Sequence, residues 1–421
     1  MSDRSPRIVF LAILLSGLSA GPGRGQLLVP MDRAQDNHLK AYGFTFGVLT
    51  AGQSAEWLLN YRAGSFLVPD SPENRRRAAL MGVTIEPVGG SELARIRSEL
   101  ESRNMESVPL EKPPRIAVYT PPNSSPWDDA VTMVLAYSEI PYEQIWDPDV
   151  LQGALDTYDW LHLHHEDFTG QYSKFYLTYA SSPWLQEEVT RNEAVARELG
   201  FATVPDLKKA VAARLHQYVE AGGFLFAMCT ATETLELALA AHDADIAASF
   251  ADGSPPDLAV ADRLDWGNTL AFEGAVLVTD PTLSAFSDID GHQVNTPWRV
   301  ELGSYTLFDF SAKFDPVPTM LTQNHERVLP DFYGLTTTFR EERLKPGVTV
   351  LAEEGRGRVK YLHGSLGEGT FTYLGGHDPE DPRHLIGDAP TDLDLHRHSA
   401  GYRLILNNVL FPAAKKKKLK T

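Results

Sequence analysis

The chain has 421 residues, 43% of them hydrophobic, and a formal net charge of −18. This length supports a large buried core and two or three domains. The acidic charge argues against nucleic acid or an anionic membrane surface as a general partner. The chain contains one cysteine, which excludes a disulfide within it.

Residues 1–25 have the layout of a cleaved secretory signal peptide. Two arginines precede an apolar run from Ile8 to Leu15, and small residues follow it. The run is too short to span a bilayer, and no later segment is long and apolar enough to do so. We therefore expect an exported protein, periplasmic or extracellular, without stable membrane insertion.

Residues 26–110 are expected to form a small N-terminal α/β domain. The apolar stretch "FTFGVL" is typical of a strand, and the amphipathic stretch "SAEWLLNYR" is typical of a helix. A Pro-rich, charged joint, "VPLEKPPR", separates this unit from the rest of the chain.

From residue 111 to residue 411, strand and helix patterns alternate. The strand-like "RIAVYT" precedes the helical "WDDAVTMVLAYSEI", for which Asp128 is a suitable N-cap. The strand-like "DWLHLHHEDF" and "FLFAMC" flank an amphipathic helix from Leu207 to Val219 that a glycine pair ends. This alternation predicts an α/β fold with a doubly wound, mostly parallel sheet.

Two segments depart from the alternation. Residues 244–347 are rich in Pro and Asp and are interpreted as a long insertion or an elaborated lid. Residues 412–421 form a basic tail, for which a solvated surface segment is a simpler interpretation than a binding patch.

Titratable residues gather at three predicted strand ends. Because the carboxyl ends of parallel strands meet at one edge of a sheet, these residues are expected to share one crevice. His162 and His164 share one face of the first strand by the two-residue period, and His165, Glu166 and Asp167 fall at its end. Cys229 follows the second strand, and His377, Asp378, Glu380 and Asp381 follow the third.

Cys229 stands where an apolar strand gives way to a helix. Thr230 and Glu233 match a capping box, so the helix is expected to begin directly after the cysteine. A thiol at a helix N-terminus has a lowered pKa and has N–H groups nearby for an oxyanion. Ala227 and Ala231 leave room for a tight elbow.

These residues allow two interpretations of Cys229. It could be a nucleophile, with His377 as its base and Glu380 or Asp378 as the acid that orients the histidine. A lone cysteine at the end of an apolar strand is, however, equally typical of a buried core residue.

The histidines also suggest a metal site. His164, His165 and His377 could supply three ligands to zinc or another divalent ion. Their spacing is not a specific signature, so hydrogen-bonded structural histidines are the simpler interpretation and no cofactor is certain.

Over about residues 115–411, the order of "RIAVYT", "DDAVTMVLAYSEI", "HHED", "AMCTA" and "GEGTFTYLGGHDPED" resembles the class I glutamine amidotransferase-like superfamily, which has a flavodoxin-like fold. The last of these segments is most similar to the ThuA-like branch. In the superfamily's amidotransferases the elbow is Gly-x-Cys-x-Gly and a later His-x-Glu completes a triad, which implies Cys229 as nucleophile and His377 as base. Here both elbow glycines are alanines, the acid lies three residues after the histidine, and ThuA-like members generally lack the cysteine.

The whole chain, including "WLHLHHEDFTGQY" and "GYRLILNNVLFPAAKKKK", also resembles exported bacterial proteins labelled asparagine synthetase B. That activity needs an N-terminal cysteine and a Ser-Gly-Gly-x-Asp-Ser loop for ATP, whereas position 2 is Ser2 and the loop is absent. The resemblance therefore does not imply ATP-dependent asparagine synthesis.

We expect an exported amidohydrolase-type enzyme that acts on a small polar molecule, with Thr230 and residues 164–167 binding the substrate. The alternative is a ThuA-like module that binds a sugar or a metal without covalent chemistry, and a third reading is an envelope scaffold that needs no pocket. The sequence does not set the oligomeric state.

Overall fold

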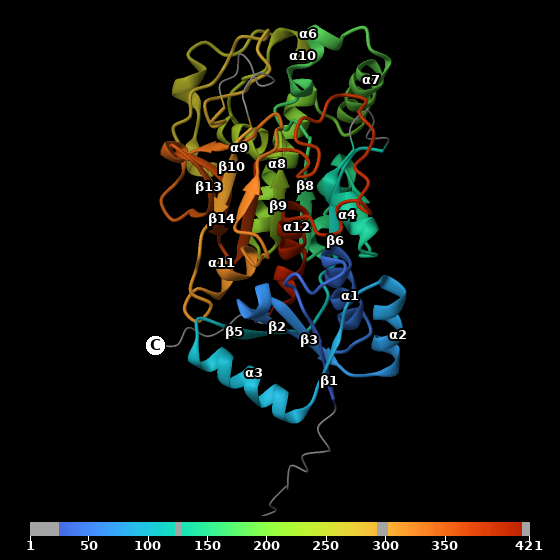
Figure 1. Ribbon diagram of the computed structural model, residues 1–421. Coiled ribbons are helices and arrows are strands. Elements are labelled where there is room, and N and C mark those ends of the chain that lie inside the picture. Colours follow the sequence, from blue (N-terminus) through green and yellow to red (C-terminus); the bar gives the residue numbers. More distant parts are fainter. Residues whose placement is uncertain (1–24, 123–127, 293–301, 415–421) are drawn as a thin grey trace, which may run out of the picture.

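The computed structural model describes residues 25–122, 128–292 and 302–414. They form a mixed α/β structure with two sheets (Figure 1). The predicted signal peptide lies outside the described residues except for Gly25, and of the basic tail only residues 412–414 are described. Within the described ranges, we find no helix with the length and apolar character needed to cross a membrane.

The N-terminal unit is built on an antiparallel five-stranded sheet with the order β4-β1-β3-β2-β5. Its strands are β1 (Gln26–Val29), β2 (Ala55–Leu59), β3 (Ser65–Pro69), β4 (Glu86–Val88) and β5 (Glu106–Leu110). Its helices are α1 (His38–Thr50), α2 (Pro72–Met81) and α3 (Gly90–Ser102).

Two predictions for this unit are wrong, because the predicted strand is a helix and the predicted helix contains a strand. The stretch "FTFGVL" lies inside α1, and "SAEWLLNYR" contains β2. Every residue of α1 except Lys40 and Thr50 is buried. A helix that is covered on nearly all sides carries apolar residues without a helical period, which is why its sequence looked like a strand.

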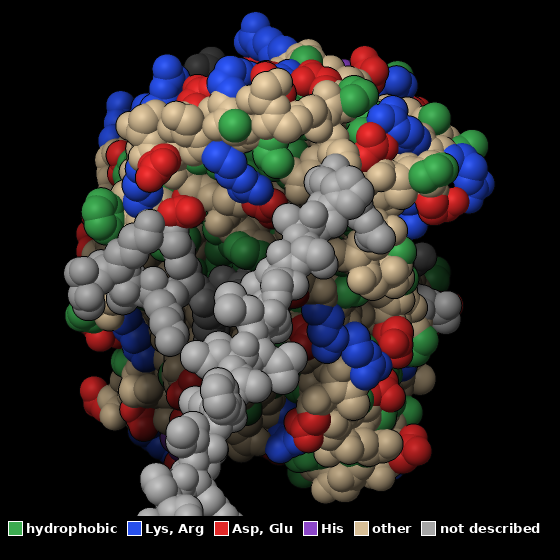
Figure 2. All heavy atoms as spheres, turned by 90° about the horizontal axis from the view of Figure 1, so that it is seen from below, with side chains coloured by type: hydrophobic (Ala, Val, Ile, Leu, Met, Phe, Trp, Pro, Cys, Tyr) green, Lys and Arg blue, Asp and Glu red, His purple; other side chains and the backbone are tan. Residues whose placement is uncertain are grey.

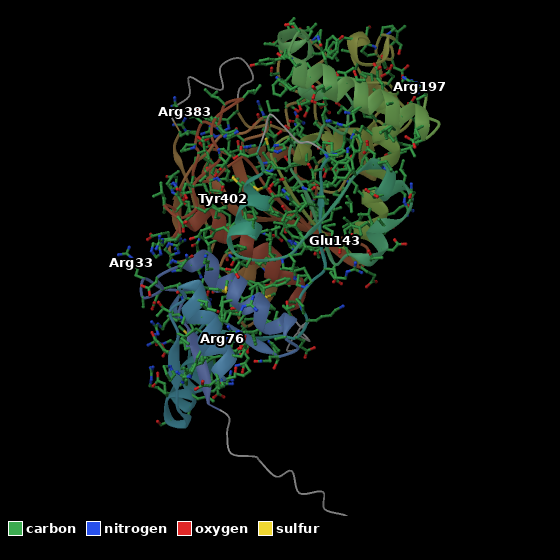
Figure 3. All side chains as sticks on the ribbon, turned by 90° about the vertical axis from the view of Figure 1, so that its right-hand side faces the viewer. Arg33, Arg76, Glu143, Arg197, Arg383 and Tyr402 are labelled. Carbon is green, nitrogen blue, oxygen red and sulfur yellow. The ribbon has the colours of Figure 1, made fainter. Side chains whose placement is uncertain are left out.

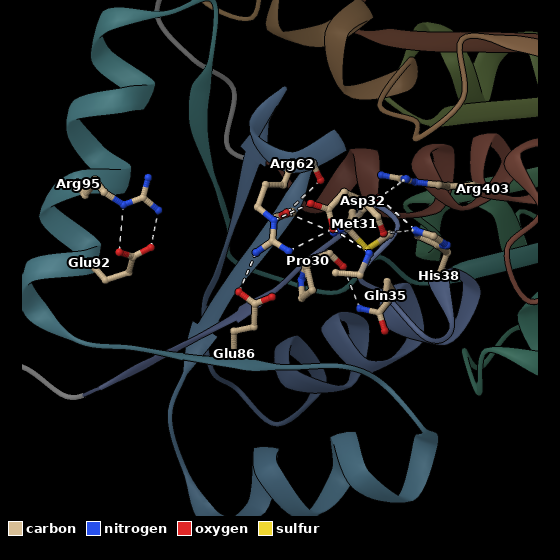
Figure 4. A network of polar contacts seen from close by, with 12 residues as sticks. Pro30, Met31, Asp32, Gln35, His38, Arg62, Glu86, Glu92, Arg95 and Arg403 are labelled. Atoms are coloured by element: carbon tan, nitrogen blue, oxygen red, sulfur yellow. Dashed lines mark hydrogen bonds and ion pairs between the residues drawn. The ribbon is translucent and has the colours of Figure 1, made fainter.

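The N-terminal unit packs against the larger part of the molecule through one continuous core that includes α1 and α12 (Ala400–Leu410). Arg403 of α12 is fully buried and donates hydrogen bonds to the Met31 carbonyl at 2.8 Å and to the Tyr42 hydroxyl at 3.0 Å. His38 Nε2 lies 2.9 Å from the Asp32 carbonyl in the same network (Figure 4). These contacts join the two parts of the molecule.

The second sheet has ten strands, and half of it is parallel. The parallel strands, in spatial order, are β7 (Glu143–Ile145), β6 (Ile116–Tyr119), β8 (Trp160–Leu163), β9 (Phe224–Met228) and β15 (Gly369–Leu374). The antiparallel strands are β14 (Arg358–Leu366), β13 (Thr349–Gly355), β10 (Ser304–Leu307), β11 (Val328–Pro330) and β12 (Phe339–Arg340). The sheet is therefore mixed rather than mostly parallel.

Helices cover both faces of the parallel strands. Along β9, Phe224, Phe226 and Met228 belong to one core, whereas Leu225 and Ala227 belong to the other, as the alternation of a strand requires. The first core includes α12 and α4 (Ala130–Tyr137), and the second includes α5 (Asp147–Leu151), α8 (Val204–Glu220) and α9 (Ala231–Ala240).

The insertion is not only a lid, because β10, β11 and β12 all come from residues 244–347 and extend the large sheet. The described part of the insertion also contains the α-helices α10 (Ser249–Asp252) and α11 (Pro316–Leu321). The helices α6 (Tyr176–Tyr179) and α7 (Pro183–Glu198) precede the insertion in the chain. In Figure 1, α6, α7 and α10 lie at the top and the N-terminal unit lies at the bottom.

The face seen from below mixes acidic and basic side chains (Figure 2).

Candidate active site

Cys229 lies on a sharp turn between β9 and α9. Its φ of +50° is in the left-handed region, which residues other than glycine rarely adopt. Such backbone strain costs about 1–3 kcal/mol and concentrates at functional sites. The Cys229 N–H donates to the Gly376 carbonyl at 3.2 Å, and α9 begins at Ala231, so the expected elbow is present.

The predicted capping box is wrong. Thr230 has helical backbone angles, and its side chain makes no cap hydrogen bond. The Glu233 carboxylate instead accepts hydrogen bonds from the hydroxyls of Ser287 at 2.6 Å and Thr336 at 2.9 Å. Thr230 lies beside the thiol, with its Oγ1 3.8 Å from the Cys229 sulfur.

His377 is the histidine next to the thiol. It follows β15, which pairs with β9, and a ring nitrogen lies within 4.8 Å of the sulfur. Burial would raise the pKa of the Cys229 thiol, but the hydrogen bond and the charge of His377 outweigh burial and lower the pKa. Burial would likewise lower the pKa of His377, but Asp128 and the sulfur raise it to about 10. Each group therefore shifts the other toward its charged form.

The acid beside His377 is Asp128. Asp128 Oδ1 lies 4.0 Å from His377 Nε2 and 3.0 Å from His384 Nε2. Although burial favours the neutral acid, the two histidines hold the pKa of Asp128 well below its usual range. Asp128, His377 and His384 therefore form one cluster, and His377 is the member that lies next to the thiol.

The acids expected from the sequence are paired elsewhere. The Glu380 carboxylate lies 2.8 Å from His396 Nδ1. Asp378 accepts a hydrogen bond from the Thr391 hydroxyl at 2.6 Å and lies beside Tyr402 of α12, a residue in the interior of the molecule (Figure 3). The expectation that one of these acids orients His377 is therefore corrected in favour of Asp128.

Asp129 has the capping role that was predicted for Asp128. Its Oδ1 accepts hydrogen bonds from the N–H groups of Val131 at 2.7 Å and Thr132 at 3.0 Å, which begins α4. The same carboxylate lies 3.3 Å from His162 Nε2 and 3.3 Å from His164 Nδ1. His162 of β8 and His164 directly after it therefore face the same carboxylate, as expected for residues two apart along an extended chain.

The rings of the three expected metal ligands lie close together, with the His377 centroid 4.6 Å from that of His164 and 5.0 Å from that of His165. The rings of His164 and His165 stack with centroids 4.2 Å apart, and burial lowers the pKa of His164 to about 4 and that of His165 well below its usual value. Among the described residues, the close group of donor atoms that includes His377 and His164 has Cys229 as its third member, in place of His165. One sulfur and two imidazoles are a ligand set that zinc accepts.

Glu166 and Asp167 organise the loop after β8. Burial raises the pKa of Glu166 to about 7, and its Oε2 lies 3.8 Å from the buried Lys208 ammonium. The Asp167 carboxylate accepts hydrogen bonds from the N–H groups of residues 169, 171 and 173. Asp167 therefore has a structural role, and no contact places either acid against the sulfur.

Residues 331–338 of the insertion lie against both the nucleophile and the base. The Leu335 N–H donates to the Cys229 sulfur at 3.4 Å, and the His377 N–H donates to the Tyr333 carbonyl at 2.7 Å. A Cβ atom on Gly334 would lie only 2.9 Å from the Cα of Gly376, so the two chain segments are in close contact. The sequence pattern of the insertion gave no sign of this contribution to the site.

The Lys360 side chain anchors the loop of residues 331–338. The side chain is fully buried, and its ammonium lies 2.5 Å from Asp331 Oδ1. It also donates to the carbonyls of Phe332 at 2.8 Å and Thr337 at 3.1 Å. One buried ammonium therefore fixes both ends of the segment that carries Leu335.

No model of a known protein family matches the chain, and no curated protein matches it. Among solved structures, cytoplasmic protein STM3548 from Salmonella typhimurium is 11% identical with a TM-score of 0.35, over 72% of this chain and 100% of that protein. Cytoplasmic protein STM1381 from Salmonella typhimurium LT2 is 12% identical with a TM-score of 0.33, over 71% of this chain and 99% of that protein. Gan42B, a GH42 β-galactosidase, is 11% identical with a TM-score of 0.29, and the match covers 63% of this chain but only 28% of the β-galactosidase.

Proposed function

We propose that the protein is an exported cysteine-dependent hydrolase of the amidohydrolase type, which cleaves an acyl bond in a small polar substrate. The observation that carries this proposal is the position of Cys229 on a strained elbow, next to His377, with Asp128 beside the histidine. The signal-peptide pattern of the first 25 residues supports export to the periplasm or the cell exterior.

We also propose that the parallel half of the large sheet is a flavodoxin-like, doubly wound domain of the class I glutamine amidotransferase-like superfamily, near its ThuA-like branch. Numbered along the chain, the five parallel strands have the spatial order 2-1-3-4-5, which supports this assignment. The candidate residues follow the carboxyl ends of β6, β8, β9 and β15, where ligands bind in such sheets.

The proposed reaction begins when the Cys229 thiolate attacks the acyl carbon and a carbon–sulfur bond forms. The His377 imidazolium then protonates the leaving nitrogen as the carbon–nitrogen bond breaks. Water next attacks the thioester and gives a proton to His377, which releases the acid and restores the thiolate. The backbone N–H of Thr230, directly after the nucleophile, is the group that would stabilise the oxyanion.

The first test exploits the fact that Cys229 is the only cysteine in the chain. Native protein is treated with iodoacetamide over a range of pH, and the adduct is counted by intact mass. We expect one adduct to form near neutral pH faster than on a free thiol, and we expect the His377→Gln variant to react slowly. Labelling that requires denaturation would contradict the proposal.

A second test traps the acyl intermediate. Incubation with p-nitrophenyl acetate should leave an acetyl adduct on the wild-type protein that hydroxylamine removes. The Cys229→Ala variant should stay unmodified under the same conditions. A panel of small amides would then identify the leaving group.

One observation favours the alternative of a metal-binding module without covalent chemistry. The donor atoms of His164, Cys229 and His377 all lie within 4.8 Å of one another. On this alternative, zinc co-purifies at one ion per chain and protects Cys229 from iodoacetamide until a chelator is added. The alternative is excluded if the protein purifies without zinc and its thiol reacts in the absence of a chelator.

A further inference from the structure

A second histidine, His384, lies beside Asp128. Its Nε2 is 3.0 Å from Asp128 Oδ1, and its Nδ1 is 2.7 Å from Asp381 Oδ2. Its ring also stacks on that of His377, with centroids 4.4 Å apart and planes 19° apart. His384 is therefore placed between two carboxylates and parallel to the proposed base.

The two carboxylates determine the protonation state of His384. A neutral imidazole has one N–H group and could serve only one of them, whereas the other nitrogen would face a carboxylate oxygen lone pair to lone pair. An imidazolium has two N–H groups and serves both. In agreement, Asp128 and Asp381 raise the pKa of His384 even though burial and the charge of His377 oppose this shift.

These contacts form a row of titratable side chains. The row consists, in order, of Cys229, His377, Asp128, His384 and Asp381, whose ionised forms alternate in sign. Within such a row each charge is stabilised by its neighbours.

We infer that His384 is a positioning residue of the proposed thiol chemistry, which holds Asp128 next to His377 through its contact with Oδ1. The inference rests on the proposed function, because it concerns the acid that supports the same base. The contact of His384 in this row is with Asp128, and the inferred role is exerted through that carboxylate.

The charged groups near His384 come from several segments. Asp128 precedes α4, His377 follows β15, and Asp381 lies in the same loop as His384. Asp388, farther along this loop, has a carboxylate oxygen within 4.8 Å of both His384 and Asp381. The loss of His384 would therefore leave His377 as the one imidazole of this set beside Asp128.

The experiment follows the pH profile of iodoacetamide labelling of Cys229 in the full-length protein. We expect His384→Ala to move the midpoint of the profile upward by about one pH unit or more, a tenfold change in proton concentration. The reason is that Asp128 would no longer be held beside His377. His384→Gln, which keeps one donor, should recover part of this shift. The control is His396→Gln, since His396 contacts Glu380 and not the row, and it should leave the profile unchanged.

Asp381→Asn provides a second variant if His384 substitutions prevent folding, because the Asp381 side chain is 27% exposed. We expect it to shift the midpoint in the same direction by a smaller amount. An unchanged profile in these variants would overturn the inference. So would a rate that falls equally at every pH, or a shift to lower pH, which would show that His384 acts on His377 only by charge repulsion.

The same data separate this inference from the proposed function. If wild-type Cys229 reacts no faster than a free thiol, the proposed function fails. If wild-type Cys229 is reactive at neutral pH and the variants at 384 and 381 match it, only the role of His384 fails.

Discussion

The decisive substitution for the proposed chemistry is Asp128→Asn. The carboxylate lies 4.0 Å from His377 Nε2 and is 15% exposed. Two unit charges at this distance interact by about 4 kcal/mol near a protein surface and by about 1 kcal/mol in water. Since Asp128 is neither fully buried nor free in solvent, and also repels the thiolate, we take a net value of about 2 kcal/mol.

This value predicts how the thiol will respond. About 2 kcal/mol lowers the ratio of the thiolate–imidazolium pair to the neutral thiol–imidazole pair by about 30-fold. We therefore expect Asp128→Asn to lose the rapid labelling of Cys229 near neutral pH, and to recover it only at alkaline pH, where the thiol ionises without help from His377.

The assay is iodoacetamide labelling against pH, together with thermal unfolding to show that the variant is folded. The matched control is Glu380→Gln, because this acid is the one that the sequence spacing suggested and its carboxylate contacts His396. The reasoning is refuted if Glu380→Gln abolishes labelling at neutral pH while Asp128→Asn labels like the wild type.

Three further substitutions test the surroundings of the site. A Cβ atom on Gly375 would lie 2.2 Å from a backbone oxygen of the loop 331–338, so Gly375→Ala should lower the free energy of unfolding by about 1–3 kcal/mol, whereas Gly90→Ala, with no atom nearby, should not. Lys360→Met leaves Asp331 buried without its partner and should cost about 3–5 kcal/mol in urea unfolding, with slower labelling of the thiol; a stable variant would contradict this. The pKa of His164 is lowered to about 4, so the unfolded chain binds its proton first on acidification. Stability should therefore fall between its ordinary pKa of about 6.5 and about 4, by up to ~3 kcal/mol, and His164→Gln should reduce this loss.

The parallel half of the large sheet could be predicted because its signals are local. The helix pattern from Leu207 to Val219 and the glycine pair after it correspond to α8, which ends at Glu220. The short apolar run before Cys229 corresponds to β9, and the small residues beside the cysteine fit the elbow. Each of these features depends on residues that are close together in the sequence.

The order of helix and strand in the N-terminal unit and the strands of the insertion could not be predicted in the same way. Because α1 packs against β2, β3, α4 and α12, nearly all of its residues are buried. Packing, and not a helical period, therefore determines its sequence. The insertion supplies strands of only two to four residues, whose pairing with distant strands stabilises them. Their sequences carry too few alternating positions to identify a strand.

The acid beside His377 could not be predicted from the sequence for a different reason. Spacing along one loop suggested Glu380, but parallel strands bring residues from separate loops to one edge of a sheet, so every acid at that edge is a candidate. Asp129 is occupied by the N–H groups of α4, and burial raises the pKa of Glu166 to about 7, which leaves it a weak source of negative charge. Asp128 alone of these three contacts His377, and the raised pKa of that histidine depends on this contact. The acid is therefore selected by competition for hydrogen bonds and by burial, which act in three dimensions and leave no mark in the spacing.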